Sequence, residues 1–453
     1  MRHTKLFRAQ TPPLMESVFR FLKTLFEEKK RILHTAMDEF DPTPPPPFAL
    51  KRHVAYFKTN LLSLPEPYKS LDTSRLNALF FCVASLDVMG ALDVTLAKVA
   101  MTRSQIIDTI YAAQLLPSGG EESASAAAAA SSSGTPAVAA TAAAGCEACG
   151  FRGNFLGAAF DAGGVSHAGD AATVDTGHIA MTFCALATLA VLGDTFERVQ
   201  RDALVVSLRA LQQPSGSFAA VPVGGEDDMR FLYCACCISH MLGDWRGVDI
   251  PRAVAYIESC RGYDGGIGMF PGSESHGGSM FTALASLALI ARRNGGAIAA
   301  EASASSCVAD REPDLGPTID APARVALVRW CSERIVAAEG GFQGRVDKKA
   351  DTCYSWWIGG SLKILGHYDI IPALTLRKFH ASCAFAFGGF AKLPAEHPDI
   401  LHSFMSILAH SMIAHELALD GGGDLLVHGL KPIDPCLMIP LQAVAASPFG
   451  TAV

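Results

Sequence analysis

Apolar and polar residues alternate in blocks along most of the chain. Segments that are apolar around most of their circumference, as buried helices must be, are expected to form an inner layer at residues 179–192, 231–242, 279–290, 353–365 and 400–410. The segments between them are more amphipathic and suit an outer layer, as at residues 199–211 and 325–338. The pattern predicts an all-α protein made of paired inner and outer helices.

A short turn rich in glycine recurs near the start of each inner segment. It is marked by Gly150, Gly216, Gly265, Gly340 and Gly388, each followed closely by a phenylalanine or isoleucine. Helix pairs that repeat about such a turn form an α/α toroid, in which glycine permits the tight loop. We therefore predict a six-hairpin-type α/α barrel.

The repeat also predicts where polar side chains gather. Asp227, His276 and Asp351 each follow the aromatic or aliphatic residue of their turn by nine positions. Equal offsets in a repeat place residues at equal heights. These side chains are therefore expected to share one rim of the barrel.

Several segments fall outside the repeat. An amphipathic helix is expected at residues 14–35, before a proline run at 44–47. Two stretches rich in Ala and Ser are expected to be disordered insertions. The predicted organisation is an N-terminal extension at 1–48, a barrel at 49–425 with insertions at about 118–145 and 295–322, and a C-terminal tail at 426–453.

The amino-acid composition excludes some classes of function. Half of the 453 residues are hydrophobic, which allows a large core, and the net charge of −7 provides no basic stripe for nucleic acid. The longest apolar runs are shorter than the roughly 20 residues that span a bilayer. The thirteen cysteines are scattered and often lie in apolar runs, and no secretory signal is recognised. We expect a cytoplasmic protein with reduced thiols and no transmembrane segment.

Three residues near the starts of two adjacent inner segments are candidate metal ligands. Asp351, Cys353 and His402 offer a carboxylate, a thiolate and an imidazole, which are acceptable zinc ligands, and three protein ligands leave a fourth position open. Each residue also has a structural interpretation, as a helix N-cap, a small buried residue and a satisfied polar group. The repeat brings all three together and favours the metal.

Cationic residues surround this predicted metal site. Arg345 and Lys348 precede Asp351, Tyr354 follows it, and His276 and Lys392 occupy neighbouring repeats; charge-assisted hydrogen bonds from such a set suit a diphosphate. A solvated basic face is the alternative interpretation.

The motifs around these residues resemble the β subunit of protein geranylgeranyltransferase type I. The resemblance runs from about Arg52 to about His410. It is carried by Ser275-His276-Gly277-Gly278-Ser279, by Gly344-Arg345 through Lys348, by Asp351-Thr352-Cys353-Tyr354-Ser355-Trp356-Trp357, and by Gly388-Gly389-Phe390-Ala391-Lys392.

The resemblance implies an α/α barrel that pairs with a prenyltransferase α subunit. It implies transfer of a geranylgeranyl group from geranylgeranyl diphosphate to the cysteine of a C-terminal Cys-a-a-X box, as on small GTPases. By motif, one zinc ion is held by Asp351, Cys353 and His402. Diphosphate contacts fall on His276, Arg345, Lys348 and Tyr354, and Arg230 and Tyr233 match positions around the lipid and peptide cavity.

The resemblance also bears on which prenyl group is used. Farnesyltransferase β subunits carry an acidic residue involved with magnesium where this chain has Lys392, so we expect catalysis without magnesium. Asn77 occupies the position where the farnesyl enzyme has a bulky aromatic residue, and it departs from the small hydroxyl residue usual in the type I family. Phe81 and Leu401 fit the geranylgeranyl pattern.

Three alternatives remain open at this point. A farnesyltransferase β subunit shares most of these motifs. A Rab-type β subunit would use substrates presented by an escort protein, and Lys392 argues against it. A non-catalytic toroid that binds partners would not need intact zinc and diphosphate positions.

Overall fold

The computed structural model describes residues 44–117, 148–153, 166–168, 176–293, 315, 319–419 and 429–449. The amphipathic helix predicted at residues 14–35 and the insertion predicted at 118–145 lie outside the described residues, as does most of the insertion at 295–322. The second insertion ends earlier than predicted, because Asp320 caps a helix that begins at Ala321.

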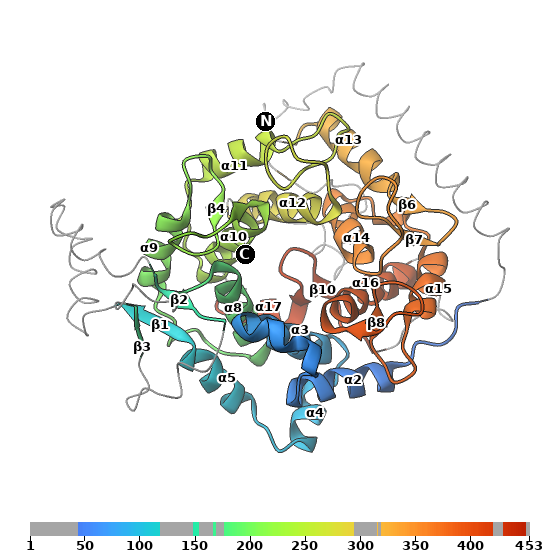
Figure 1. Cartoon of the computed structure of the whole chain (residues 1–453), viewed down its shortest axis with the longest axis horizontal. Helices are drawn as coiled ribbons and strands as arrows, with labels where there is room; N and C mark the ends of the chain where they lie inside the picture. The colour runs from blue at the N-terminus through green and yellow to red at the C-terminus, as the bar shows by residue number, and fades with distance from the viewer. Residues whose placement is uncertain are drawn as a thin grey trace, which may run out of the picture.

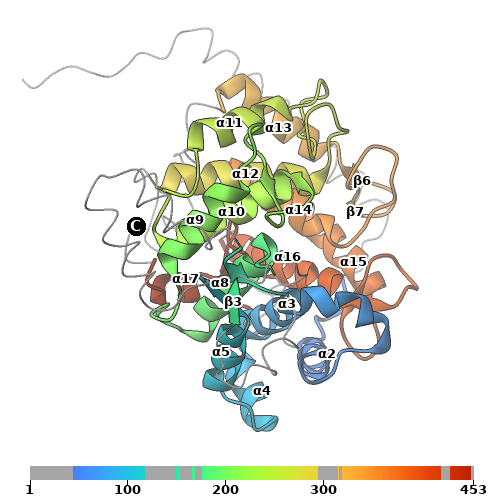
Figure 2. The same cartoon turned by 60° about the vertical axis from the view of Figure 1, so that its left-hand side comes forward.

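Two concentric layers of helices form the described part of the chain (Figures 1 and 2). The inner layer comprises α3 (Arg75–Val88), α8 (Ile179–Leu192), α10 (Met229–Leu242), α12 (Gly277–Arg292), α14 (Tyr354–Leu365) and α16 (Ile400–Leu419). The outer layer comprises α2 (Leu50–Leu62), α5 (Arg103–Ala112), α9 (Arg201–Leu211), α11 (Ile250–Ser259), α13 (Ala321–Ser332) and α15 (Ala373–Cys383).

The inner helices close into a ring. Each packs on the next in chain order, and α16 packs back against α3. Their sequences explain the layer, because nearly every residue of α8 and α10 is buried, whereas α9 and α11 are amphipathic. The predicted all-α toroid is confirmed.

Short strand pairs precede several inner helices. β4 (Phe218–Ala219) pairs with β5 (Asp227–Asp228), β6 (Ile335–Val336) with β7 (Gly341–Phe342), and β8 (Phe390–Ala391) with β9 (Pro398–Asp399), all antiparallel. A three-stranded sheet has the order β2 (Gly150–Phe151), β1 (Gln114–Pro117), β3 (Ser166–Ala168). The remaining short elements are η1 (Glu66–Ser74), α4 (Leu92–Lys98), η4 (Tyr368–Ile370), β10 (Ile433–Asp434), β11 (Ile439–Pro440) and α17 (Leu441–Ala446).

The glycine turns pack against the outer helix of the following repeat. Gly216 and Gly388 have φ of +99° and +100°, a conformation that favours glycine. A Cβ on Gly216 would collide with the carbonyl oxygen of Arg252 in α11, and one on Gly388 with that of Arg52 in α2. The last turn therefore packs on the first outer helix and closes the ring.

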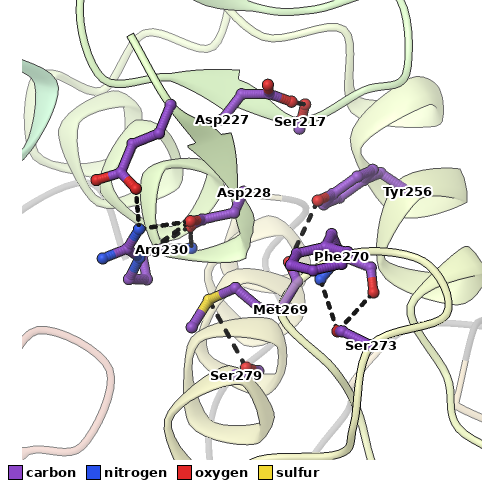
Figure 3. A network of polar contacts seen from close by, with 10 residues as sticks. Ser217, Asp227, Asp228, Arg230, Tyr256, Met269, Phe270, Ser273 and Ser279 are labelled. Carbon is purple, nitrogen blue, oxygen red and sulfur yellow. Dashed lines mark hydrogen bonds and ion pairs between the residues drawn. The ribbon is translucent and has the colours of Figure 1, made fainter.

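Polar residues cap the inner helices at one rim, as the repeat predicted. The side chains of His178, Asp228, His276, Asp351 and Asp399 each accept a backbone N–H from the first turn that follows. The prediction of Asp227 for this set is wrong by one residue, since Asp228 takes the place. Asp227 is exposed and accepts a hydrogen bond from the Ser217 hydroxyl (Figure 3). The reason is that the hairpin before α10 is one residue longer than the hairpins before α14 and α16.

The predicted C-terminal tail belongs to the barrel. Residues 429–449 lie at the centre of the ring in Figure 1, and Asp434 forms a buried ion pair of 2.8 Å with Arg292 at the end of α12. Lys431 pairs with Asp87 of α3, also at 2.8 Å. The boundary predicted at residue 425 is therefore too early.

No single helix in the described ranges is long and apolar enough to cross a membrane. One sharply bent pair, Glu66–Val88 with Leu92–Lys98, meets the test by length and composition only.

Buried imidazoles join the two ends of the ring. His53 of α2 stacks on Phe390 with centroids 4.4 Å apart and accepts the N–H of Gly389. His380 of α15 bonds Ser355 and lies 4.9 Å from the ring of His410 in α16. Burial lowers the pKa of His53 to about 4 and of His380 to about 3, and lowers that of His410 as well.

We predict that acid destabilises this seam. At pH values between the ordinary histidine pKa of 6.5 and the lowered pKa values of the native protein, these imidazoles bind protons in the unfolded chain but not in the native one. The free energy of unfolding therefore falls as the pH falls through this range. The loss at about pH 5 is about 2 kcal/mol each for His53 and His380, and His410 adds to it in the same direction.

Thermal unfolding at about pH 7.5 and about pH 5 measures this loss. His410→Phe, which keeps an aromatic ring among Phe48 and Phe390, should show a smaller drop in melting temperature between the two pH values than the parent protein. His397→Gln, outside the seam, is the control. An equal drop in His410→Phe and the control would contradict the prediction.

Candidate functional site

The N-terminal ends of α14 and α16 bring the three predicted metal ligands together. Asp351 and Cys353 stand just before α14 and His402 lies in the first turn of α16; one ligand atom from each lies within 4.8 Å of the other two. Asp351 and Cys353 are buried, and His402 Nε2 is 3.3 Å from Asp351 Oδ1. The described residues contain no other such group of potential ligands.

Local hydrogen bonds hold this arrangement. The N–H of Asp351 donates to Phe342 O, and Thr352 donates from its N–H to Lys392 O and from its hydroxyl to Ala391 O. Asp351 Oδ1 accepts the N–H of Cys353 at 2.9 Å. The N-cap of α14 is Cys353, so the N-cap interpretation of Asp351 is wrong; the hydrogen bond from the Cys353 N–H instead fixes the Asp351 carboxylate beside the imidazole.

Asp399 is a site residue that the sequence analysis missed. Its Oδ2 lies 2.6 Å from His402 Nδ1, which leaves Nε2 directed at Asp351. A carboxylate behind a ligating histidine fixes the ring and its tautomer and strengthens the metal bond. The available signal was its place in the repeat, since Asp399 follows Phe390 by the same nine residues that separate Asp351 from Phe342.

The electrostatics of the three side chains favour a bound cation. Burial, and then the neighbouring Asp351 carboxylate, raise the pKa of the Cys353 thiol well above its ordinary value. Burial acts to lower the pKa of His402, but hydrogen bonds to Asp351 and Asp399 outweigh it and raise the pKa to about 9. A divalent cation between these donors would compensate the carboxylate and allow the thiol to ionise. The residues fit a zinc site with an open fourth position.

A basic cavity of about 270 Å³ adjoins the ligands. It is lined by Gly344, Arg345, Lys348, Lys349, Asp351, Tyr354, Lys392 and Leu393. The ammonium of Lys392 lies 3.9 Å from Asp351 Oδ2, so the cavity and the ligand cluster share a wall. Lys349 was not predicted; its position next to Lys348 was the only signal.

Tyr354 lines this cavity, and the ring of His276 contacts its hydroxyl. His276 Nδ1 accepts the N–H of Gly278, so the neutral ring carries its proton on Nε2, 3.0 Å from the Tyr354 hydroxyl. The Tyr354 hydroxyl accepts this hydrogen bond, so its own O–H can point towards an anion. Gly344 makes the arrangement possible, because a Cβ there would collide with the Tyr354 ring. Burial, and then Arg345, lower the pKa of His276.

Arg345 lies on the exposed side of the cavity. Its guanidinium is paired with Glu274 at 3.1 Å, and both side chains are solvent-exposed. Pairs of this kind contribute little free energy and exchange easily. Arg345 is therefore free to turn to an anionic ligand.

The predicted lipid and peptide residues lie on three inner helices, α3, α10 and α16. Arg230 is held by Asp228 at 2.6 Å and Glu226 at 2.9 Å (Figure 3). The side-chain oxygen of Asn77 accepts a hydrogen bond from the thiol of Cys184, and Asn77 is half-buried. The remaining three are Phe81, which stacks on Phe404, Leu401, which is exposed at the rim, and Tyr233, which is buried.

Aromatic side chains form a belt inside the barrel. Successive ring centroids are 4.8 to 5.8 Å apart from Phe404 through Phe81 and Phe80 to Phe183, Tyr233, Phe281 and Trp357. Phe183, Tyr233, Phe281 and Phe404 each follow the N-cap of their helix by five residues, so the repeat places them at one level. A ring of apolar aromatics below a polar rim suits a long apolar ligand with an anionic head.

Fold and site together define an α/α toroid with a candidate metal site and a basic cavity at one rim. The family model described as prenyltransferase alpha-alpha toroid domain matches residues 48–439. This match includes the C-terminal strand β10 and ends at the first residue of β11.

Prenyltransferase β subunits are among the proteins whose sequences are similar to this chain. The chain is 33% identical to the geranylgeranyl transferase type-1 subunit beta of Arabidopsis thaliana, over 90% of this chain and 94% of that protein. It is 32% identical to the corresponding subunit of Dictyostelium discoideum, over 87% and 96%. The protein farnesyltransferase subunit beta of Schizosaccharomyces pombe is 26% identical, over 82% and 79%.

A solved structure shares the fold. Candida albicans protein geranylgeranyltransferase-I complexed with GGPP superposes with a TM-score of 0.63 at 20% identity, covering 89% of this chain and 99% of that chain. The chain belongs to the prenyltransferase α-α toroid family, with the type-1 geranylgeranyl transferase β subunits among its relatives.

We predict that the purified protein binds one zinc ion through the three ligands. Cys353→Ala and His402→Ala should lose the metal, and Asp399→Asn should weaken binding about 10- to 100-fold by freeing the His402 ring. Elemental analysis and competition with a chelator measure both effects. Cys331→Ala, a buried cysteine of α13, is the control. Full zinc retention in folded Cys353→Ala would refute the site.

Proposed function

We propose that this chain is the catalytic β subunit of a zinc-dependent protein geranylgeranyltransferase type I. It would transfer the geranylgeranyl group of geranylgeranyl diphosphate to the cysteine of a C-terminal Cys-a-a-X box, forming a thioether. The observation that carries this proposal is the shared wall between the ligand cluster and the basic cavity, where Lys392 stands beside Asp351. A thiol and a diphosphate bound there would meet at one point.

Zinc held by Asp351, Cys353 and His402 would bind the substrate cysteine in its open position and keep it as a thiolate at neutral pH. Asp399 fixes His402 for this task. The burial of Asp351 and Cys353 keeps water away from the ligands.

The basic cavity would stabilise the leaving group. As the carbon–sulfur bond forms and the bond from C1 to the diphosphate oxygen breaks, negative charge grows on the diphosphate. Arg345, Lys348 and the Tyr354 hydroxyl, which His276 orients, would supply hydrogen bonds that strengthen with that charge, so they would lower the barrier more than they tighten ground-state binding.

Lys392 would provide a fixed charge where farnesyltransferases use magnesium. Its main-chain oxygen is tied to Thr352 N, which holds the residue next to the ligand cluster. An ammonium at this place neutralises part of the diphosphate charge without a second metal.

The apolar belt would receive the lipid. Asn77 lies at its mouth in place of a bulky aromatic residue, and Cys184 satisfies its carbonyl oxygen, which lessens the cost of polarity beside a lipid. This supports a geranylgeranyl over a farnesyl group, as does the higher identity to type-1 subunits than to the farnesyltransferase subunit.

The proposal includes a heterodimer with a prenyltransferase α subunit, Cys-a-a-X proteins such as small GTPases as substrates, and a cytoplasmic location. The eleven cysteines of the described residues are free and buried, which is usual in a reducing compartment. A non-catalytic toroid is not favoured, because every donor of the metal and anion sites is present.

Co-expression with an α subunit and transfer assays with both diphosphates test the proposal. We expect transfer of geranylgeranyl to a Cys-a-a-X peptide without added magnesium. Absence of transfer from either diphosphate by a folded, zinc-loaded heterodimer would refute the enzymatic assignment, and farnesyl preference would refute the choice of lipid.

We further predict that Lys392→Asp makes catalysis depend on magnesium. Turnover without magnesium should fall by about a hundredfold or more, because the carboxylate adds charge beside the diphosphate, and millimolar magnesium should restore part of it. Rates measured across a magnesium titration check this. Lys69→Asp, at an exposed residue of η1 that pairs with Glu66, should show no magnesium response. A magnesium requirement in the parent protein would contradict the role of Lys392.

A further inference from the structure

A second cavity, an open groove of about 710 Å³, shares no lining residue with the basic cavity. It is bounded by the last turn of α2, by η1, by one side of α3 and by α5, which Figure 1 shows in one part of the ring. Its apolar lining includes Leu61, Leu62, Leu64, Leu79, Met101 and Ile106. Leu62 is 52% exposed, and of these six residues only Ile106 is buried. The groove therefore presents apolar surface to water, which is typical of a binding surface.

The charged residues along this groove pair with one another. Lys69 and Glu66 are 3.1 Å apart, and Arg75 and Asp72 are 2.6 Å apart. All four side chains are exposed, and such pairs contribute little to stability. Because their charges already compensate one another, the groove favours an apolar occupant over a charged one.

One buried acceptor in the groove lacks a donor. Asn60 lines the groove and is only 6% exposed. Its side-chain nitrogen donates to Tyr56 O at 3.0 Å, but its side-chain oxygen accepts no hydrogen bond from the described residues. Most buried polar atoms in proteins have a hydrogen-bond partner. The occupant is therefore expected to carry a donor within an apolar surface.

The N-terminal segment of this chain combines these two properties. The apolar face of the helix expected at residues 14–35 comprises Leu14, Val18, Leu22, Leu25, Phe26 and Leu33. Lys29 falls in the middle of this face, because it follows Leu25 by four residues and precedes Leu33 by four. An ammonium group offers three donors, and a helix of this length is marginal in water unless its apolar face is buried.

The segment is long enough to reach the groove. The N-terminal part of the described chain begins at Pro44, six residues before α2, and the groove begins at the last turn of α2, about 20 Å further along. Residues 36–43 span up to about 26 Å, and a helix at 14–35 is about 33 Å long. A tethered segment also has a millimolar effective concentration, which favours it over a separate molecule.

We propose that residues 14–35 dock as a helix in this groove, with Lys29 donating to the side-chain oxygen of Asn60. The docked helix also covers Tyr68, which lines the groove and whose hydroxyl accepts the N–H of Ile400 at 2.9 Å. Ile400 begins α16, the helix that carries His402. The N-terminal extension thereby supports the part of the barrel that holds the candidate metal site.

Hydrogen exchange in the full chain, co-expressed with an α subunit, tests the docking. Amides of residues 18–33 should exchange at least about tenfold more slowly than in a synthetic peptide of the same sequence. Leu62→Asp places a carboxylate in the apolar groove and should remove most of this protection. Val94→Asp, at a residue of α4 that is 59% exposed and does not line the groove, is the matched control and should keep it.

The Lys29–Asn60 pair is tested by rescue. Asn60→Leu should lower the protection about tenfold, because it leaves a buried ammonium without an acceptor, and Lys29→Met added to it should restore the protection, because both partners are then apolar. A structural role of Asn60 within α2 alone would not be rescued by a change at Lys29. If Asn60→Leu does not fold, as judged by its melting temperature, Leu62→Asp still decides whether the segment docks.

Photo-crosslinking identifies the surface that the segment contacts. Phe26→benzoylphenylalanine should crosslink to residues 60–82 or 101–109 of the same chain. Crosslinking to the α subunit or to a second copy of the chain would overturn the proposal, as would unprotected amides at residues 18–33 in the parent protein. Neither measurement depends on prenyl transfer, so failure of the proposed function would leave this result unaffected.

Discussion

A main-chain hydrogen bond from the start of an inner helix to the next hairpin recurs around the ring and fixes the height of the side chains that precede that helix. Ile179 donates to Ala220 O, Met229 to Met269 O, Gly277 to Gly344 O and Thr352 to Lys392 O, at 2.9 to 3.2 Å. These four acceptors occupy the same place in successive repeats. The bond at Thr352 fixes Asp351 and Cys353 against the hairpin that carries Lys392, so the metal centre and the cation beside it depend on the register of the barrel.

The same geometry creates an electrostatic imbalance that a ligand can relieve. Asp351 is buried next to a thiol whose pKa is raised, while Arg345, Lys348 and Lys349 crowd a cavity in a chain of net charge −7. If this rim had only a structural role, its acidic and basic side chains would be expected to pair with one another. Instead the cations have only exposed or distant partners among the described contacts, which is the arrangement expected where a cation and an anion bind side by side.

The inner helices could be predicted from the sequence because a helix that is buried on all sides is apolar around its whole circumference, which a surface helix is not. The sequence also predicted that Asp351, Cys353 and His402 lie together, because a repeat converts sequence offsets into positions. It failed where an offset changed by one residue, as at Asp228. It failed again at residues 429–449, where two-residue strands held by Asp434 and Lys431 leave no periodic pattern. The partners of these two residues, Arg292 and Asp87, lie far away in the chain, and such contacts are visible only once the ring has closed.

The C-terminal segment therefore changes how the interior is understood. A toroid of six helix pairs has two open ends, and an apolar lumen open at both would expose aromatic residues to water on each side. Closing one end with a hairpin anchored by Arg292 removes that exposure and converts a channel into a cup of fixed depth. Tyr233 belongs to both parts, since its ring completes the belt and its hydroxyl satisfies a buried carbonyl of the floor. A change at Tyr233 therefore alters the aromatic belt and its contact with the C-terminal hairpin together.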